Sequence, residues 1–168
     1  MKRLFTLLIS SFIVLAANAQ VRLEGFRTML ADSRVSASYS YDVDGTVPVG
    51  GKGTVIVQGN CWTSKGNGMR IYCDGTSIWT VDEEAKEVYI EQAMDDSVQS
   101  VVGRFIDKAT EIRSSKGVIT GSFTDETSGG KVRFRIADVK STPTSSDLSA
   151  FRLRTETLGK DWVVTDLR

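Results

Sequence analysis

The chain has 168 residues, 21 basic and 21 acidic side chains, and no histidine. This length suits one domain with a substantial hydrophobic core. The absence of histidine removes the most common general base and metal ligand, and it excludes hydrolases that pair histidine with serine or cysteine.

The first 19 residues have the pattern of a secretory signal peptide. A basic start precedes an apolar run over residues 4–16, and a small-x-small tripeptide ends at Ala19. The run is shorter than the roughly 20 residues that span a bilayer. We expect cleavage after Ala19 and a periplasmic protein in which residues 20–168 form a single domain. Because residue 20 is Gln and not Cys, we expect no acyl anchor on the chain itself.

Charge limits the class of partner. Without Lys2 and Arg3 of the predicted leader, the chain has 19 basic and 21 acidic residues, a formal charge of −2. This balance argues against nucleic acid or an anionic membrane surface as the main partner. We expect a monomer that needs no metal and no cofactor.

A helix and a strand are predicted first. Residues 21–33 place Phe26, Met29 and Leu30 on one helical face, which indicates an amphipathic helix. Residues 35–43 alternate apolar and polar side chains, which is the clearest strand pattern in the chain.

A meander of strands is predicted next. The glycine-rich segment 44–53 is expected to be a turn, because it lacks the spacing of a phosphate-binding loop. Strands follow at residues 54–58, on both sides of Gly66-Asn67-Gly68, and on both sides of Asp74-Gly75. Alternating large apolar side chains predict that one face of this sheet is apolar.

The two cysteines, Cys61 and Cys73, lie on either side of the Gly66-Asn67-Gly68 turn. Counting outward from Asn67 as the centre of a three-residue turn places Cys61 opposite Cys73. Because exported compartments favour oxidation, we expect a disulfide between them, stabilising the fold by roughly 3 kcal/mol. The alternative is a pair of buried free thiols.

A second helix interrupts the sheet. Between residues 94 and 112 the apolar side chains recur at helical spacing, and Asp95 or Asp96 could cap the start. Strands are predicted again at residues 118–124, 131–139, 150–155 and 161–166. These elements predict an α+β fold with a curved antiparallel sheet, whose apolar concave side is covered by amphipathic helices.

Several of these features occur together in one known family. They are the N-terminal helix, the strand at 35–43, Gly53-Thr54 opening a strand, the hexapeptide Asp74-Gly75-Thr76-Ser77-Ile78-Trp79, and a closing strand that ends at Asp166-Leu167-Arg168. With them the chain resembles the LolA-like periplasmic outer-membrane lipoprotein carrier proteins.

The resemblance implies an unclosed half-barrel with a helical lid. It also implies transfer of acylated lipoproteins from an inner-membrane ABC transporter to an outer-membrane acceptor. The chain departs from the family at Gly59-Asn60, where a basic residue and a proline are common, so the family's functional arginine is not carried over. The cysteine pair is a further departure, and so is a shorter second half.

Alternation selects the apolar residues that could line a ligand site. Candidates for the concave face are Tyr39, Tyr41, Val55, Val57, Trp62, Trp79, Val81, Tyr89, Phe134 and Ile136. Candidates for the lid are Phe26, Met29 and Leu30. For any one of these residues, the alternative is ordinary core between helix and sheet, and alternation alone favours it. Trp62 and Trp79 are the better candidates for ligand contact, because indole combines a wide apolar surface with a polar tip.

Three functions are compatible with this pattern. The leading interpretation is a non-enzymatic periplasmic carrier that binds the acyl chains of a lipoprotein, or another lipid, in an apolar cavity. The alternative is a lipid- or protein-binding sensor or adaptor with the same fold and no shuttling. A small exported enzyme is the third, and the acidic pairs Glu83-Glu84 and Asp95-Asp96 are better explained by a turn and a helix cap.

Overall fold

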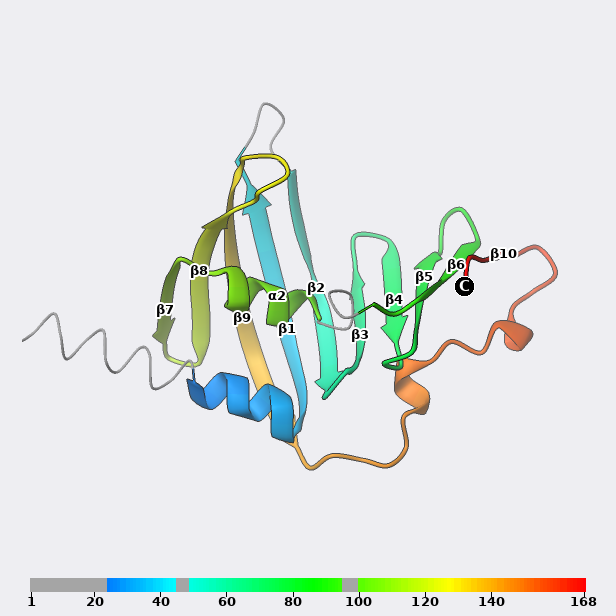
Figure 1. The fold of residues 1–168 in the computed structure, drawn as a ribbon, viewed down its shortest axis with the longest axis horizontal. Coiled ribbons are helices and arrows are strands. Elements are labelled where there is room, and N and C mark those ends of the chain that lie inside the picture. The colour runs from blue at the N-terminus through cyan, green and yellow to red at the C-terminus, as the bar shows by residue number, and fades with distance from the viewer. Residues whose placement is uncertain (1–23, 45–48, 95–99) are drawn as a thin grey trace, which may run out of the picture.

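The computed structural model describes residues 24–44, 49–94 and 100–168. Ten strands are present in these segments, namely β1 (Arg34–Val43), β2 (Val49–Gln58), β3 (Cys61–Gly66), β4 (Met69–Cys73), β5 (Ser77–Asp82), β6 (Glu87–Gln92), β7 (Glu111–Ser115), β8 (Val118–Thr124), β9 (Lys131–Thr142) and β10 (Val163–Asp166). They form one open sheet in the order β10-β6-β5-β4-β3-β2-β1-β9-β8-β7 (Figure 1). Every neighbouring pair is antiparallel except β10 and β6, which run parallel.

Two α-helices accompany the sheet in the described part of the chain. The N-terminal helix is described over residues 24–32, and α2 spans Val101–Lys108. The side chain of Ser100 caps α2, accepting a hydrogen bond from the backbone N–H of Gly103 at 3.2 Å. The predicted caps Asp95 and Asp96 lie outside the described residues. The predicted α+β class with an unclosed sheet is therefore confirmed.

The turn between β3 and β4 overturns the predicted disulfide. Asn67 and Gly68 have φ values of 53° and 78°, so the hairpin has a two-residue turn in the left-handed region and not a three-residue turn. The register moves by one residue, so that Gly66 pairs with Met69 and Trp62 pairs with Cys73. Cys61 therefore does not lie opposite Cys73, and both cysteines are buried free thiols.

Residues 49–53 of the glycine-rich segment belong to strand β2 and not to the predicted turn, and residues 45–48 lie outside the described residues. Gly51 and Gly53 lie within β2, directly opposite Tyr41 and Tyr39 of β1. A Cβ added to Gly51 would lie 2.6 Å from the Tyr41 ring, and one added to Gly53 would lie 2.7 Å from the Tyr39 hydroxyl. The glycines are present because the tyrosine rings occupy the space above them.

Three other segments differ from the sequence-based expectation. The second helix is only eight residues long, and β7 occupies residues assigned to its C-terminal end. The strand predicted at 150–155 is absent, because this segment forms two 3-10 turns, η1 (Ser149–Phe151) and η2 (Thr155–Thr157). Phe151 of η1 is fully buried, with Arg34 placed 5.1 Å from its ring centroid. The alternating apolar residues of this segment thus reflect packing of an irregular segment onto the sheet.

The sheet carries its apolar side chains on different faces at its two ends. Cys73 of β4 pairs with Ile78 of β5 on one face, and the neighbouring pair, Tyr72 and Trp79, lies on the other. The first face holds the helix-side cluster, whose buried members are Phe26, Ala37, Val55, Val57, Trp62, Cys73, Ile78, Val102, Phe105, Ile106, Ile119, Phe123, Val132, Phe134 and Ile136. The second face, called the outer face below, holds the C-terminal cluster of Trp79, Val81, Val88 and Ile90, against which Leu153, Leu158 and Trp162 pack.

In the described segments, no helix has both the length and the apolar character needed to cross a bilayer.

Candidate functional site

The helix-side cluster contains a floor of aromatic rings lying over glycines. Tyr39 and Tyr41 lie over glycines of β2, and Phe134 of β9 pairs with Gly121 of β8. A Cβ on Gly121 would lie 2.5 Å from the Phe134 ring, so this ring also rests on the sheet surface. With Phe123 these residues form what we call the aromatic floor. Because the rings lie close to the sheet surface, another element of the chain can pack on top of them.

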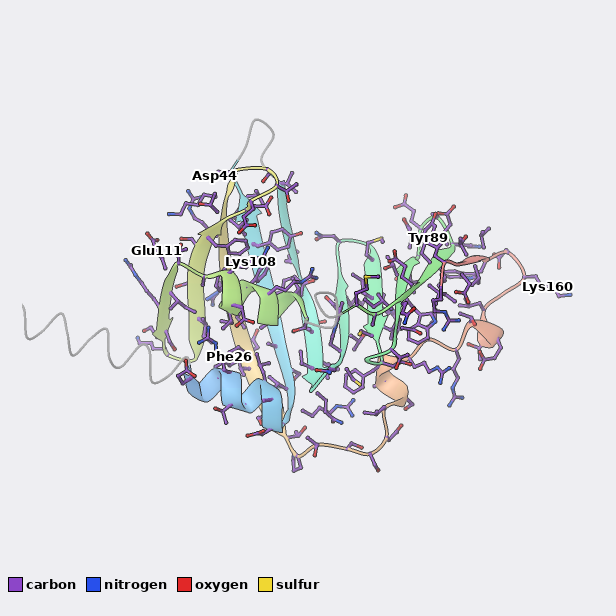
Figure 2. All side chains as sticks on the ribbon, in the orientation of Figure 1. Phe26, Asp44, Tyr89, Lys108, Glu111 and Lys160 are labelled. Carbon is purple, nitrogen blue, oxygen red and sulfur yellow. The ribbon has the colours of Figure 1, made fainter. Side chains whose placement is uncertain are left out.

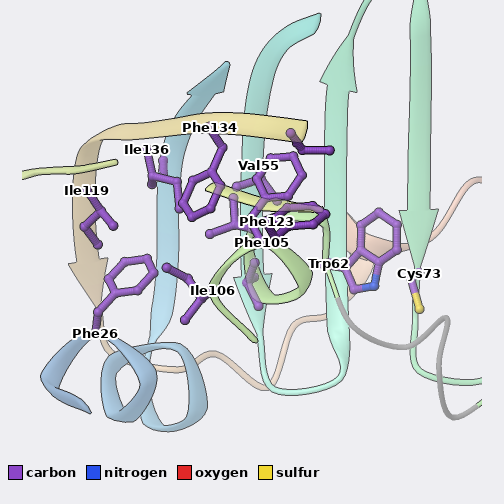
Figure 3. Close-up of a cluster of buried hydrophobic side chains, with 14 of the residues drawn as sticks. Phe26, Val55, Trp62, Cys73, Phe105, Ile106, Ile119, Phe123, Phe134 and Ile136 are labelled. Carbon is purple, nitrogen blue, oxygen red and sulfur yellow. The ribbon is translucent and has the colours of Figure 1, made fainter. Parts of the chain in front are cut away.

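Phe105 of α2 occupies that space. Its ring stacks on Phe134 with centroids 5.1 Å apart and an interplanar angle of 18°. It makes edge contacts to Tyr41 at 5.6 Å and Tyr39 at 6.4 Å, and a tilted contact to Phe123 at 6.1 Å. Figure 3 shows the ring among these strands, with Ile106 beside it. Phe105 therefore contacts every member of the aromatic floor.

The N-terminal helix reaches the same cluster at another point. Phe26 is a buried member of the cluster, and Leu30 packs against it partly buried. Met29 is half-buried and is not among the residues that pack there. Arg27 lies 3.6 Å from Asp107 of α2, so an exposed ion pair links the two helices. Of the three predicted lid residues, the structure thus places two in the cluster.

Trp62 supplies a buried polar atom without a partner. Its side chain is 3 % exposed, and among the described residues its indole Nε1–H has no hydrogen-bond acceptor. The other polar groups nearby are satisfied, since the hydroxyls of Tyr39 and Ser64 lie 2.9 Å apart. An unpaired buried donor is unfavourable in an empty site, and it is available to a ligand that brings an acceptor.

The remaining predicted site residues divide between the two faces. Val55, Val57, Phe134 and Ile136 belong to the helix-side cluster as buried residues. Trp79 and Val81 lie in the C-terminal cluster. Tyr89 of β6 pairs with Thr80, on the same face as Ile78, and is 40 % exposed (Figure 2). The separation follows from the hairpin register, because one residue of shift moves every side chain of a strand to the opposite face.

Sequence reasoning missed the residues that complete the site. Val102, Phe105 and Ile106 recur at helical spacing in the sequence, but this spacing does not show that they face the aromatic floor. Phe123 was one apolar position in a predicted strand, and only the β8–β9 register places it beside Phe134. The available signal was the pairing of glycines with aromatics across strands, which requires the register to be known.

The titratable groups near the cluster do not form a reactive centre. Burial raises the pKa of the Cys73 thiol and, with Asp74 nearby, that of the Cys61 thiol, so both thiols stay protonated and are poor nucleophiles. No group of histidine, cysteine or acidic side chains in the described segments has the geometry of a metal site. What the arrangement offers is apolar surface and one free hydrogen-bond donor.

No protein-family model matches the chain, and no curated protein matches it in sequence. Function is therefore inferred from the residues and their geometry.

Proposed function

We propose that the protein is an exported carrier that binds the acyl chains of a lipoprotein on the helix-side face of its sheet and moves them toward the outer membrane. The observation that best supports this proposal is the aromatic floor. Its four rings all contact Phe105, which belongs to a helix of only eight residues. An acyl chain would replace this ring and its neighbours when α2 moves away, so α2 acts as the lid.

The free energy gained by burying an acyl chain exceeds the free energy lost when the buried side chains of α2 leave the aromatic floor. Val102, Phe105 and Ile106 are the buried residues of α2. Burying each side chain stabilises by about 1.5–3 kcal/mol, so removing all three costs about 5–9 kcal/mol. An acyl chain with about fifteen methylenes gains about 12 kcal/mol when it is fully buried, at about 0.8 kcal/mol each. One acyl chain can therefore displace α2, and several chains can do so more readily.

The unpaired indole of Trp62 adds chemical selectivity. The diacylglyceryl group of a bacterial lipoprotein carries ester carbonyls next to its acyl chains. Trp62 Nε1–H has no partner among the described residues and belongs to the cluster that the chains would enter. An ester carbonyl would satisfy this donor, so the proposed site recognises an acyl ester and not a hydrocarbon alone.

Native mass spectrometry with a triacylated lipoprotein tests the proposal. We expect a one-to-one complex that is lost when the acyl chains are removed from the same lipoprotein. The matched control is the deacylated polypeptide at the same concentration. A complex that survives deacylation would show recognition of the polypeptide, which is the adaptor function, and the absence of any complex would refute the carrier proposal.

A further inference from the structure

The outer face of β9, β1 and β2 has a depression lined in part by basic side chains, and the carrier function does not use them. Its volume is about 350 Å³, and its lining includes Ser38, Ser40, Lys52, Thr54, Arg135 and Ala137. Short side chains in the centre explain why the surface is hollowed here. The β1–β9 register shifts beside it, between the pairs Ser36–Lys140 and Ser38–Ala137, and Ser38 donates a hydrogen bond of 2.6 Å to the Asp138 carboxylate at this edge.

Two basic side chains flank one serine in this depression. Ser40 of β1 pairs with Lys52 of β2 on one side and with Arg135 of β9 on the other. Neighbouring strands lie about 4.8 Å apart, so the two Cα atoms are separated by about 10 Å with Ser40 midway. Both side chains point to the same face and can reach a single anion above Ser40. The Ser40 hydroxyl makes no hydrogen bond within the described residues and is free to donate.

Neither Lys52 nor Arg135 forms an ion pair in the described segments, whereas the neighbouring basic residues of β9 do. The acidic residues next to the depression are Asp138, which accepts the hydrogen bond from Ser38, and Asp42, which is paired with Arg133 across the strands. Arg133 makes two hydrogen bonds to Asp44, at 2.6 and 2.7 Å, and Lys131 lies 3.6 Å from Glu111. The basic side chains left over on this face therefore meet in the depression.

The positive charge continues along the face. Arg113 of β7 lies in the same row as Arg135, since both pair with Thr120 of β8. Lys65 of β3 pairs with Thr54 at the other end of the depression. The strip across the six adjacent strands β7-β8-β9-β1-β2-β3 has four basic residues, namely Arg113, Arg135, Lys52 and Lys65. The near-zero charge of the whole chain conceals this local excess.

The surroundings favour a lipid phosphate over a protein partner. Hot spots of protein interfaces are enriched in tryptophan and tyrosine as well as arginine, and they lie in well-packed, desolvated pockets. The exposed large hydrophobic residues of the described segments are Val49, Tyr89, Met94, Leu148, Val163, Val164 and Leu167, and none of them lies in the strip or its depression. The face offers instead cations and hydroxyls, which are the donors that bind phosphate oxygens.

We infer that Lys52, Ser40 and Arg135 form a binding site for the phosphate of an anionic phospholipid headgroup, and that the basic strip binds the outer face of the sheet to the surface of an anionic membrane. The site is independent of acyl-chain binding, because it lies on the opposite face of the sheet. A carrier bound in this way would hold its helix side toward the aqueous phase.

Vesicle co-sedimentation of the purified protein without cargo tests this inference. We expect binding to mixed phosphatidylglycerol–phosphatidylcholine vesicles, weakening as salt rises, and little binding to phosphatidylcholine alone. The double variant Lys52→Ser, Arg135→Ser should bind the anionic vesicles about 30-fold more weakly, since each basic residue near such a surface contributes about fivefold. Circular dichroism should show an unchanged fold, because both side chains are exposed.

The control variant Arg154→Ser, Lys160→Ser makes the same change in net charge away from the depression and should bind as the unmodified protein does. Equal losses in the two double variants would refute the site, because net charge alone would then explain binding. Absence of binding to anionic vesicles would also refute it. Binding of inorganic phosphate in calorimetry, combined with no binding to anionic vesicles, would identify a free-phosphate site and overturn the membrane assignment.

Discussion

Replacing Phe105 by alanine tests whether α2 is a movable lid or ordinary core. Phe105 is 8 % exposed and contacts four aromatic rings. Buried Phe→Ala substitutions cost about 3–5 kcal/mol. We expect about 3 kcal/mol here, because α2 is short and can settle onto the floor.

The same loss should strengthen binding if α2 must leave before an acyl chain can enter. The apparent affinity of a ligand is reduced by the fraction of protein that is open, so destabilising the closed state raises it. A loss of about 3 kcal/mol corresponds to an increase of up to about 150-fold in affinity for a fluorescent fatty acid. Urea unfolding gives the stability of the same sample.

Phe151→Ala is the matched control. Phe151 is also a buried phenylalanine, but it lies in η1, outside the helix-side cluster. The control should lose similar stability and leave the affinity for the fatty acid unchanged. If Phe105→Ala lost stability and bound the probe no more tightly than the control, α2 would be core and the lid hypothesis would be wrong.

Three further changes have defined outcomes. Trp62→Phe removes the unpaired indole N–H and keeps an apolar ring, so calorimetry should show a smaller preference for ester-linked over ether-linked lipids, by about 1 kcal/mol. Arg168 holds the Asp166 pKa at about 2, below its usual 3.8, so the ionised Asp166 stabilises this contact above about pH 4 and the effect disappears as pH falls to 2. Arg168→Ala should return the carboxyl titration, followed by NMR, toward 3.8. Gly53→Ala should cost about 1–3 kcal/mol in thermal unfolding, because its Cβ would lie 2.3 Å from a backbone carbonyl of β3, whereas Gly25→Ala, with open space around it in a helix, should be neutral or stabilising.

Local patterns predicted most elements of the sheet. The alternation in β1 and the aspartate-glycine turn before β5 were sufficient to locate these strands. The two α-helices were also predictable from their apolar spacing, although α2 is shorter than expected. Such features depend on neighbouring residues, which the sequence displays directly.

The register was not predictable to the last residue. Gly66-Asn67-Gly68 is compatible with a two- or a three-residue turn, and the choice decides whether Cys61 or Trp62 faces Cys73. The strand role of Gly53 likewise depends on Tyr39, which is fourteen positions away in sequence. These outcomes are set by contacts between strands, where a shift of one residue exchanges the two faces.

The positions of the unpaired charges are likewise set by contacts between strands. The formal balance of the chain argued against an anionic surface, yet Lys52 and Arg135 come together from strands separated by more than eighty residues. Their neighbours Arg133 and Lys131 are neutralised by acids that the fold also brings close. Net charge is a property of composition, whereas a binding surface depends on which charges remain unpaired after folding.

Under the carrier proposal, the change of apolar face along the sheet makes one end the end that opens while the other stays closed. The C-terminal segment is held by the packing of Leu153, Leu158 and Trp162 on the C-terminal cluster, and also by the pairing of β10 with β6. Lys86 and Asp161 add an ion pair. Detaching this segment would break strand hydrogen bonds together with apolar contacts. α2 adds no strand pairing to the sheet, and its hold on it comes from its buried side chains. Because an acyl chain can replace apolar contacts but cannot replace strand pairing, the carrier proposal expects α2 to be the element that a lipid displaces.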